Sequence, residues 1–188
     1  MKIYGSFTSP FVRHCRIALL ETELSCEFIE TDATQSATIS PTKKVPLLVD
    51  GDLTLTDSSS ILRYLREKSG TGFMADIVDF ELFNMTNTVM DASVNIFFLE
   101  KFDNITAEQS QYLSRQKARV LSGLEALNEA PINAQLPLSD GLIRLACFLD
   151  WGIYRERINL KALTNLTRLL DVARTDKNFI KTAPPIDG

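Results

Sequence analysis

From the start of the chain to Gly72, short apolar runs alternate with longer stretches in which apolar residues recur every three or four positions. Runs of the first kind are typical of β-strands, and stretches of the second kind are typical of amphipathic helices. The pattern predicts strands over residues 3–6, 27–30, 45–49 and 53–55, helices over 11–23 and from 57 onward, and a weaker helix over 32–42. This order, βαβαββα, indicates a small α/β domain over residues 1–73.

Beyond Gly72 only the helical pattern continues. It predicts helices over residues 76–102, 106–129, 139–154 and 159–175, followed by a tail at 183–185. Thr106 is followed by Gln109, which is the spacing of a capping box at a helix start. Because no strand pattern occurs in this part of the sequence, we expect residues 77–188 to form a second, all-helical domain.

The turn between the first predicted strand and the first predicted helix reads Ser6-Phe-Thr-Ser-Pro10. Proline is tolerated in the first turn of a helix, and Ser9 directly before it suits the N-cap position. A helix N-terminus also offers free N–H groups and partial positive charge to an anion. The pattern alone fits a helix cap and a chemical site equally well.

Composition narrows the function classes. The 188 residues carry a net charge of −4, which argues against a nucleic-acid binder that works by bulk charge. The three cysteines are far apart and the one histidine, His14, reads as a surface residue, so we expect reduced thiols, no metal site and a cytoplasmic protein. Met1-Lys2 leads straight into the first strand and no apolar run is long enough for a membrane span, so we expect no leader and no membrane partner.

Three stretches together resemble one family. They read SPFVRHCRIALLE, KKVPLLVDGDLTLTDSSSILRYL and LSDGLIRLACFLDWGIYR, in the order and spacing found in cytosolic glutathione transferases. The sequence resembles the serine-type bacterial members over nearly its whole length. The resemblance implies a thioredoxin-like N-terminal domain, an all-α C-terminal domain, glutathione as co-substrate and a homodimer. It implies transfer of the glutathione thiolate to a small electrophile, which the sequence does not identify.

The resemblance assigns the catalytic role to Ser9. In serine-type members the matching hydroxyl donates a hydrogen bond to the glutathione sulfur, and this favours the thiolate, the reactive form. Thr8 is the alternative hydroxyl, because the geometry of the turn does not follow from the sequence. Phe11 and Arg13 are secondary candidates, Arg13 because its charge adds positive potential one turn into the same helix.

The resemblance also assigns the rest of the glutathione site. Val45-Pro46 matches a cis proline beside a residue whose backbone pairs with the cysteinyl part of glutathione. Asp57 and Ser58, at a helix N-terminus, match residues that hold the γ-glutamyl group, and Lys44 is a candidate for the glycyl carboxylate. From the residues alone, Pro46 is equally the first residue of an edge strand, and Asp57 and Ser58 are equally ordinary caps.

Two positions depart from the family pattern. Lys43 stands where a glycine is common, which is expected to reshape the loop. The usual hydroxyl cap of the buried helix is replaced by Pro137, so that Ser139 is the remaining candidate.

The alternative function is a non-catalytic interaction module. Bacterial stringent starvation proteins share the fold and act by binding other proteins. Failure to bind glutathione favours this alternative.

Overall fold

The computed structural model describes residues 1–186, which form two compact units. Unit 1 comprises residues 1–75 and the C-terminal segment from Arg174 onward, and unit 2 comprises Asp76–Ala173. The predicted domains, 1–73 and 77–188, stay a prediction; the two units differ from them because the C-terminal segment groups with unit 1.

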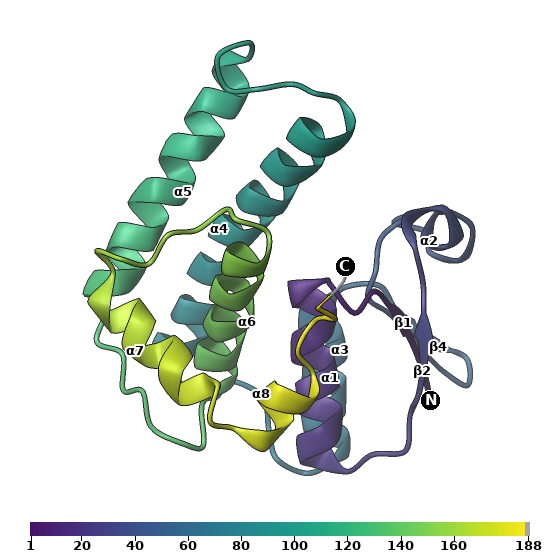
Figure 1. The fold of residues 1–188 in the computed structure, drawn as a ribbon. Coiled ribbons are helices and arrows are strands. Elements are labelled where there is room, and N and C mark those ends of the chain that lie inside the picture. The colour runs from purple at the N-terminus through teal and green to yellow at the C-terminus, as the bar shows by residue number, and fades with distance from the viewer. Residues whose placement is uncertain (187–188) are drawn as a thin grey trace. The chain divides into compact units, whose positions relative to one another are not determined.

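Unit 1 has the predicted element order, followed by a short C-terminal helix that the pattern did not predict (Figure 1). Its elements are β1 (Lys2–Gly5), α1 (Pro10–Thr22), β2 (Glu27–Glu30), α2 (Ala33–Ile39), β3 (Leu47–Asp50), β4 (Leu53–Leu55), α3 (Ser58–Lys68) and α8 (Lys177–Lys181). The strands form one sheet in the order β2-β1-β3-β4, with β1 and β2 parallel and the other pairs antiparallel. Figure 1 shows α1 and α3 side by side against this sheet.

The register of the sheet defines the face that is buried. Ile3 on β1 lies opposite Phe28 on β2 and opposite Leu48 on β3, so the three side chains point to one face. Ile3 and Leu48 are fully buried, as are Val12 of α1 and Leu65 of α3. The core of unit 1 therefore lies between this face of the sheet and the two helices.

Gly5 allows α1 to begin close to the end of β1. A Cβ atom at this position would lie 2.5 Å from Cγ1 of Val12, which is too close for any side chain. Any larger residue at Gly5 would therefore push α1 away from the strand that precedes it.

Unit 2 consists of four helices: α4 (Ile77–Phe102), α5 (Gln111–Glu129), α6 (Asp140–Tyr154) and α7 (Thr164–Ala173). α4 packs against α5 and α6, and α7 packs against α5 and α6. Most of α6 is buried, and apart from Arg144 its buried residues are apolar or glycine. The all-helical pattern predicted beyond Gly72 is confirmed.

Two helix starts differ from the prediction. α5 begins at Gln111 rather than Thr106, because Ser110 is the N-cap: its Oγ accepts from the N–H of Leu113 at 3.3 Å. Thr106 and Gln109 form only one of the two hydrogen bonds of a capping box: the Thr106 N–H donates to Oε1 of Gln109. This bond encloses an isolated turn and not the start of a helix. Similarly, the helix expected from residue 159 begins only at Thr164.

Ser139 takes over the cap position that Pro137 cannot fill. Its Oγ accepts from the N–H of Leu142 at 3.3 Å and donates to Oδ1 of Asp79 on α4. Oδ2 of Asp79 accepts from the N–H of Gly141 at 3.2 Å. The N-terminus of the buried helix is therefore capped by two residues, one of which comes from another helix.

The expectation that His14 lies on the surface is wrong. His14 is fully buried in α1, with Arg13 and Cys15 buried on either side of it. The local pattern places these residues on a helix, but the packing of both α3 and α8 against α1 covers more than one of its faces.

None of the helices among residues 1–186 has the length and apolar character needed to cross a bilayer.

Candidate functional site

Three loops that carry the predicted site residues lie at one edge of the sheet. β1 ends at Gly5, and because Tyr4 pairs with Leu47, the antiparallel β3 begins next to that end. Leu48 pairs with Leu55, so β4 ends at the same edge. The Ser6–Ser9 turn, the Lys44–Pro46 loop and the start of α3 therefore adjoin three neighbouring strands at one place.

Ser9 is the N-cap of α1, as its position before Pro10 predicts. Its Oγ accepts from the N–H of Val12 at 3.4 Å, which is a long hydrogen bond, and its side chain is half-buried. Within residues 1–186 the Ser9 hydroxyl has no protein acceptor for its own proton. The O–H is thus available to donate at a helix N-terminus, where partial positive charge also favours an anion.

Thr8 and Ser6 bond to each other. Their hydroxyl oxygens are 3.1 Å apart, and the Thr8 N–H donates to Oγ of Ser6 at 3.3 Å. The Ser9 N–H donates to the Ser6 carbonyl at 3.2 Å, which closes a tight turn. The turn therefore engages the Thr8 hydroxyl in a bond to Ser6, whereas the Ser9 hydroxyl bonds, among the described residues, only as the acceptor at the N-terminus of α1. Phe11 lies in the first turn of α1 and is half-buried.

Arg13 lies against the C-terminal segment. Its side chain is buried, one of its Nη atoms donates to the Phe179 carbonyl at 3.0 Å, and its Cζ lies 3.8 Å from the centroid of the Phe179 ring. The guanidinium is therefore engaged with α8, and the contribution of its charge at Ser9 stays a prediction.

The Lys44–Pro46 loop has the backbone that the resemblance implies. The Val45-Pro46 peptide bond is cis, Pro46 is buried, Val45 is half-buried and Lys44 is exposed. Across the described part of the chain, neither the N–H nor the C=O of Val45 bonds to another group. Both groups are free for strand-like pairing with a bound peptide.

Lys43 has a backbone conformation that is unusual for a residue other than glycine. Its φ is 54°, in the left-handed region that glycine adopts without cost. The Lys43 N–H donates to the Ser40 carbonyl at 2.9 Å, and its own carbonyl accepts from Oγ of Ser36 at 3.4 Å. The effect of lysine at this position on the shape of the loop stays a prediction.

The start of α3 is capped by Asp57. Its Oδ1 accepts from the N–H of Ser59 at 2.8 Å, and its side chain is exposed. Ser58, the first residue of the helix, is 5% exposed, and its carbonyl lies 4.0 Å from Sγ of Cys15. Asp57 can thus both cap the helix and face a ligand, while contact with Ser58 depends on the few atoms that it exposes.

The arrangement combines three features that suit a small anionic thiol peptide. It has a hydroxyl donor at one helix N-terminus, an unpaired backbone N–H and C=O beside it, and a second helix N-terminus with an exposed carboxylate. Among residues 1–186 no three His, Cys, Asp or Glu side chains gather in a way that could hold a metal ion. A hollow of about 500 Å³ occurs in unit 2, lined by Ile153, Leu160 and the residues from 156 to 159, and it includes none of the predicted site residues.

Comparison with known proteins supports the same interpretation of unit 1. Residues 3–72 match the family described as "Glutathione S-transferase, N-terminal domain". The chain is also 25% identical over 202 aligned positions to YibF of Escherichia coli K12, described as an uncharacterized GST-like protein, and the alignment covers 98% of this chain and 99% of that one.

Solved structures show the same fold over nearly the whole chain. A glutathione S-transferase from Methylobacillus flagellatus with bound glutathione matches with a TM-score of 0.83 at 22% identity, over 98% of this chain and 99% of that one. A second, from Methylobacterium radiotolerans in complex with glutathione sulfonate, matches with a TM-score of 0.83 at 24% identity, over 97% and 94% of the chains. The predicted fold, a thioredoxin-like domain followed by helices as in glutathione transferases, is confirmed.

Proposed function

We propose that this chain, which carries a glutathione S-transferase N-terminal domain over residues 3–72 and the glutathione transferase fold throughout, is a serine-type glutathione transferase. It conjugates the glutathione thiolate to a small electrophile. The observation that carries the proposal is the Ser9 hydroxyl at the N-terminus of α1, which has a proton to donate and no protein acceptor among residues 1–186.

The chemistry required of Ser9 is to favour the thiolate. A thiol near neutral pH is mostly protonated and reacts slowly, whereas its thiolate is the nucleophile. A hydrogen bond from Ser9 and the partial positive charge of the α1 N-terminus both stabilise the anion and lower the pKa of the bound thiol. The thiol proton is released to solvent. The thiolate sulfur then bonds to the electrophilic carbon while one bond of that carbon breaks: its electron pair departs with a leaving group, or, where the sulfur adds to a double bond, stays on the adjacent part of the electrophile and takes a proton from solvent.

The remaining site residues hold the rest of glutathione. The N–H and C=O of Val45, beside Pro46, pair with the cysteinyl residue. The start of α3 receives the γ-glutamyl carboxylate, with Asp57 facing the ammonium group and Ser58 adding contacts. Lys44, exposed on the loop, reaches the glycyl carboxylate. Solved structures of the same fold hold glutathione or glutathione sulfonate, which supports glutathione as the ligand of this chain.

The deciding experiment is glutathione binding by titration calorimetry, combined with thiolate absorbance followed against pH. A hydrogen bond to a charged group contributes about 1.5–3 kcal/mol, so replacing Ser9 is expected to raise the pKa of the bound thiol by about one to two units. Ser9→Gly is the better variant, because glycine at an N-cap costs only a few tenths of a kcal/mol whereas alanine costs about 1 kcal/mol.

Thr8→Ala is the matched control, because it removes a hydroxyl that bonds within the turn. We expect it to leave the thiol pKa almost unchanged. A shift with Thr8→Ala and none with Ser9→Gly would transfer the catalytic role to Thr8. No binding at millimolar glutathione would contradict the proposed enzyme and favour the interaction module instead.

The proposal also includes a homodimer located in the cytoplasm. Size-exclusion chromatography tests the dimer.

A further inference from the structure

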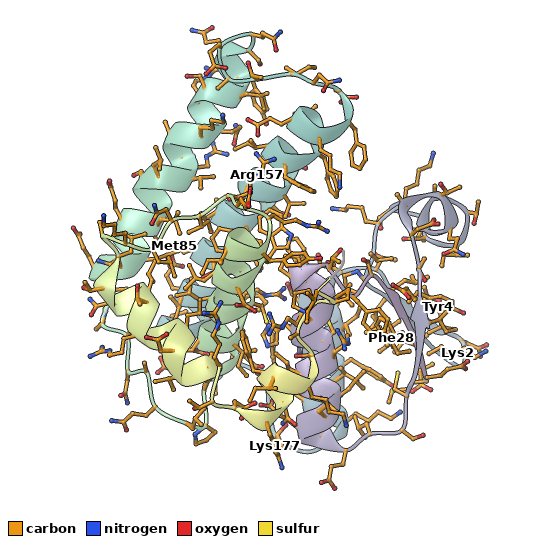
Figure 2. The ribbon with its side chains drawn as sticks, in the orientation of Figure 1. Lys2, Tyr4, Phe28, Met85, Arg157 and Lys177 are labelled. Carbon is orange, nitrogen blue, oxygen red and sulfur yellow. The ribbon has the colours of Figure 1, made fainter. Side chains whose placement is uncertain are left out.

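The Ser6–Ser9 turn contacts a distant part of unit 1 through a side chain that the proposed chemistry does not use. Phe7, at the second position of the turn, packs against Phe28 of β2 with ring centroids 4.7 Å apart and planes inclined by 37°. Figure 2 labels Phe28. The other bonds that define the turn, between residues 6, 8, 9 and 12, are all local.

Arg16 of α1 packs over this aromatic pair. Its Cζ lies 4.6 Å from the centroid of Phe7 and 5.4 Å from that of Phe28. Its Nη1 donates to the carbonyl of Thr182, just after α8, at 3.1 Å. One half-buried guanidinium therefore connects the turn, β2 and the C-terminal segment, three parts of unit 1 that are far apart in the sequence.

The chemistry of arginine suits this place. A planar guanidinium can stack on aromatic rings while its N–H groups donate hydrogen bonds in the plane of the guanidinium itself. A lysine ammonium has no such plane and cannot do both. The Arg13 side chain bonds to the same C-terminal segment through Phe179, but neither that bond nor its ring contact involves the turn. The two arginines thus share the attachment of the C-terminal segment and differ in their contact with Phe7.

We propose that Arg16 is a positioning residue for the site: by holding Phe7 against Phe28 it fixes the turn that presents the Ser9 hydroxyl. This inference rests on the proposed function for its chemical consequence, but its structural part can be tested without glutathione. A rigid support of this kind matters because even a small displacement of the hydroxyl donor weakens thiolate stabilisation and slows catalysis.

The test compares Arg16→Gln with Phe179→Leu in the full chain, using hydrogen exchange of the backbone amides of residues 6–9 as the first measurement. Arg16→Gln is expected to speed their exchange roughly tenfold, since it removes the stacked cation from Phe7. Arg16→Lys keeps a cation and a hydrogen-bond donor but loses the planar group that stacks on Phe7. Its exchange rate at residues 6–9 is expected to lie between those of Arg16→Gln and the native chain. Phe179→Leu loosens the C-terminal segment at Arg13, so it is expected to lower the melting temperature without changing exchange at 6–9.

The second measurement is the pKa of the glutathione thiol when bound. We expect Arg16→Gln to raise it and to lower kcat/KM roughly tenfold through kcat, with Phe179→Leu leaving both unchanged. Equal exchange rates at residues 6–9 in Arg16→Gln and Phe179→Leu would overturn the inference, because Arg16 would then only stabilise the fold. If the native chain binds no glutathione, the proposed function fails while the exchange comparison still decides the role of Arg16.

Discussion

At the scale of single residues, the site depends on groups left without partners inside the protein. The Ser9 hydroxyl keeps its proton available because its Oγ acts only as an acceptor among residues 1–186, and the N–H and C=O of Val45 bond to no other described group. Both residues were identified through the family resemblance. Whether Ser9 or Thr8 contacts a bound thiol is open in the sequence, because the direction of each hydroxyl depends on torsion angles that the residue types do not determine.

Lys43 yields a prediction at this scale. A residue other than glycine at φ 54° carries a conformational cost, so Lys43→Gly is expected to stabilise the protein by about 0.5–1 kcal/mol. Lys43→Val is expected to destabilise it by more than that, because a β-branched residue tolerates the left-handed region poorly. Denaturant unfolding measures both free energies.

Lys44→Gly is the control for Lys43, because Lys44 does not have a positive φ. Glycine there adds only freedom to the unfolded chain, so we expect a loss of stability. Stabilisation by glycine at both positions would show that the left-handed backbone of Lys43 is not the cause.

At the scale of elements, helix starts are decided by capping contacts that often come from elsewhere. Ser139 and Asp79 cap α6 together although they lie 60 residues apart. Ser110 and not Thr106 caps α5, because the half-formed capping box of Thr106 encloses only an isolated turn. A sequence shows several candidate caps, and the packing of the helix selects one of them.

The turn between β3 and β4 is held to α3 by Asp50. Lys68 Nζ donates to Asp50 Oδ2 at 2.7 Å and the Tyr64 hydroxyl donates to it at 2.6 Å. The hydrogen bond from Lys68, followed by that from Tyr64, lowers the pKa of Asp50 to about 2. Because the folded pKa is below the ordinary value of about 3.9 for the unfolded chain, the carboxylate contributes stability above about pH 4 that is lost as the pH falls towards 2.

Asp50→Asn is therefore expected to lower the denaturant midpoint at pH 7, and the difference from the native chain is expected to shrink between about pH 4 and pH 2. Urea unfolding over this pH range measures it. Glu27→Gln, which removes the longer and more exposed pair with Lys2 at 3.6 Å, is the control and is expected to have little effect at pH 7. A difference for Asp50→Asn that persists unchanged at pH 2 would contradict the role of the charged carboxylate.

At the scale of the whole molecule, all predicted glutathione contacts lie in unit 1, and they come from three separate loops. Antiparallel pairing of β1 with β3 and of β3 with β4 brings the loops to one edge. The C-terminal segment belongs to the same unit through the bonds of Arg13 and Arg16. The proposed glutathione half of the site therefore lies within one compact unit.

Glutathione is therefore expected to slow hydrogen exchange in three stretches of unit 1: residues 6–12, 44–47 and 57–61. A free ligand concentration of 100 times the Kd stabilises the native state by about 2.7 kcal/mol. This is enough to detect as slower exchange in these stretches. Mass spectrometry of exchanged peptides with and without glutathione makes the measurement. S-methylglutathione, which cannot form a thiolate, is the control and is expected to protect residues 6–12 less. Protection confined to residues 76–173 would contradict the proposed site.

The sequence by itself determined the strands at 27–30 and 53–55, the cap at Ser9, the order of elements in unit 1 and the helical character of unit 2. These features arise from periodicity and capping within a few residues, which a linear pattern records. The tertiary structure alone decided that His14 is buried, that Arg13 faces Phe179 across 166 positions and that a C-terminal helix joins unit 1. Such outcomes depend on which distant surfaces pack together, and no short stretch of sequence specifies its partner.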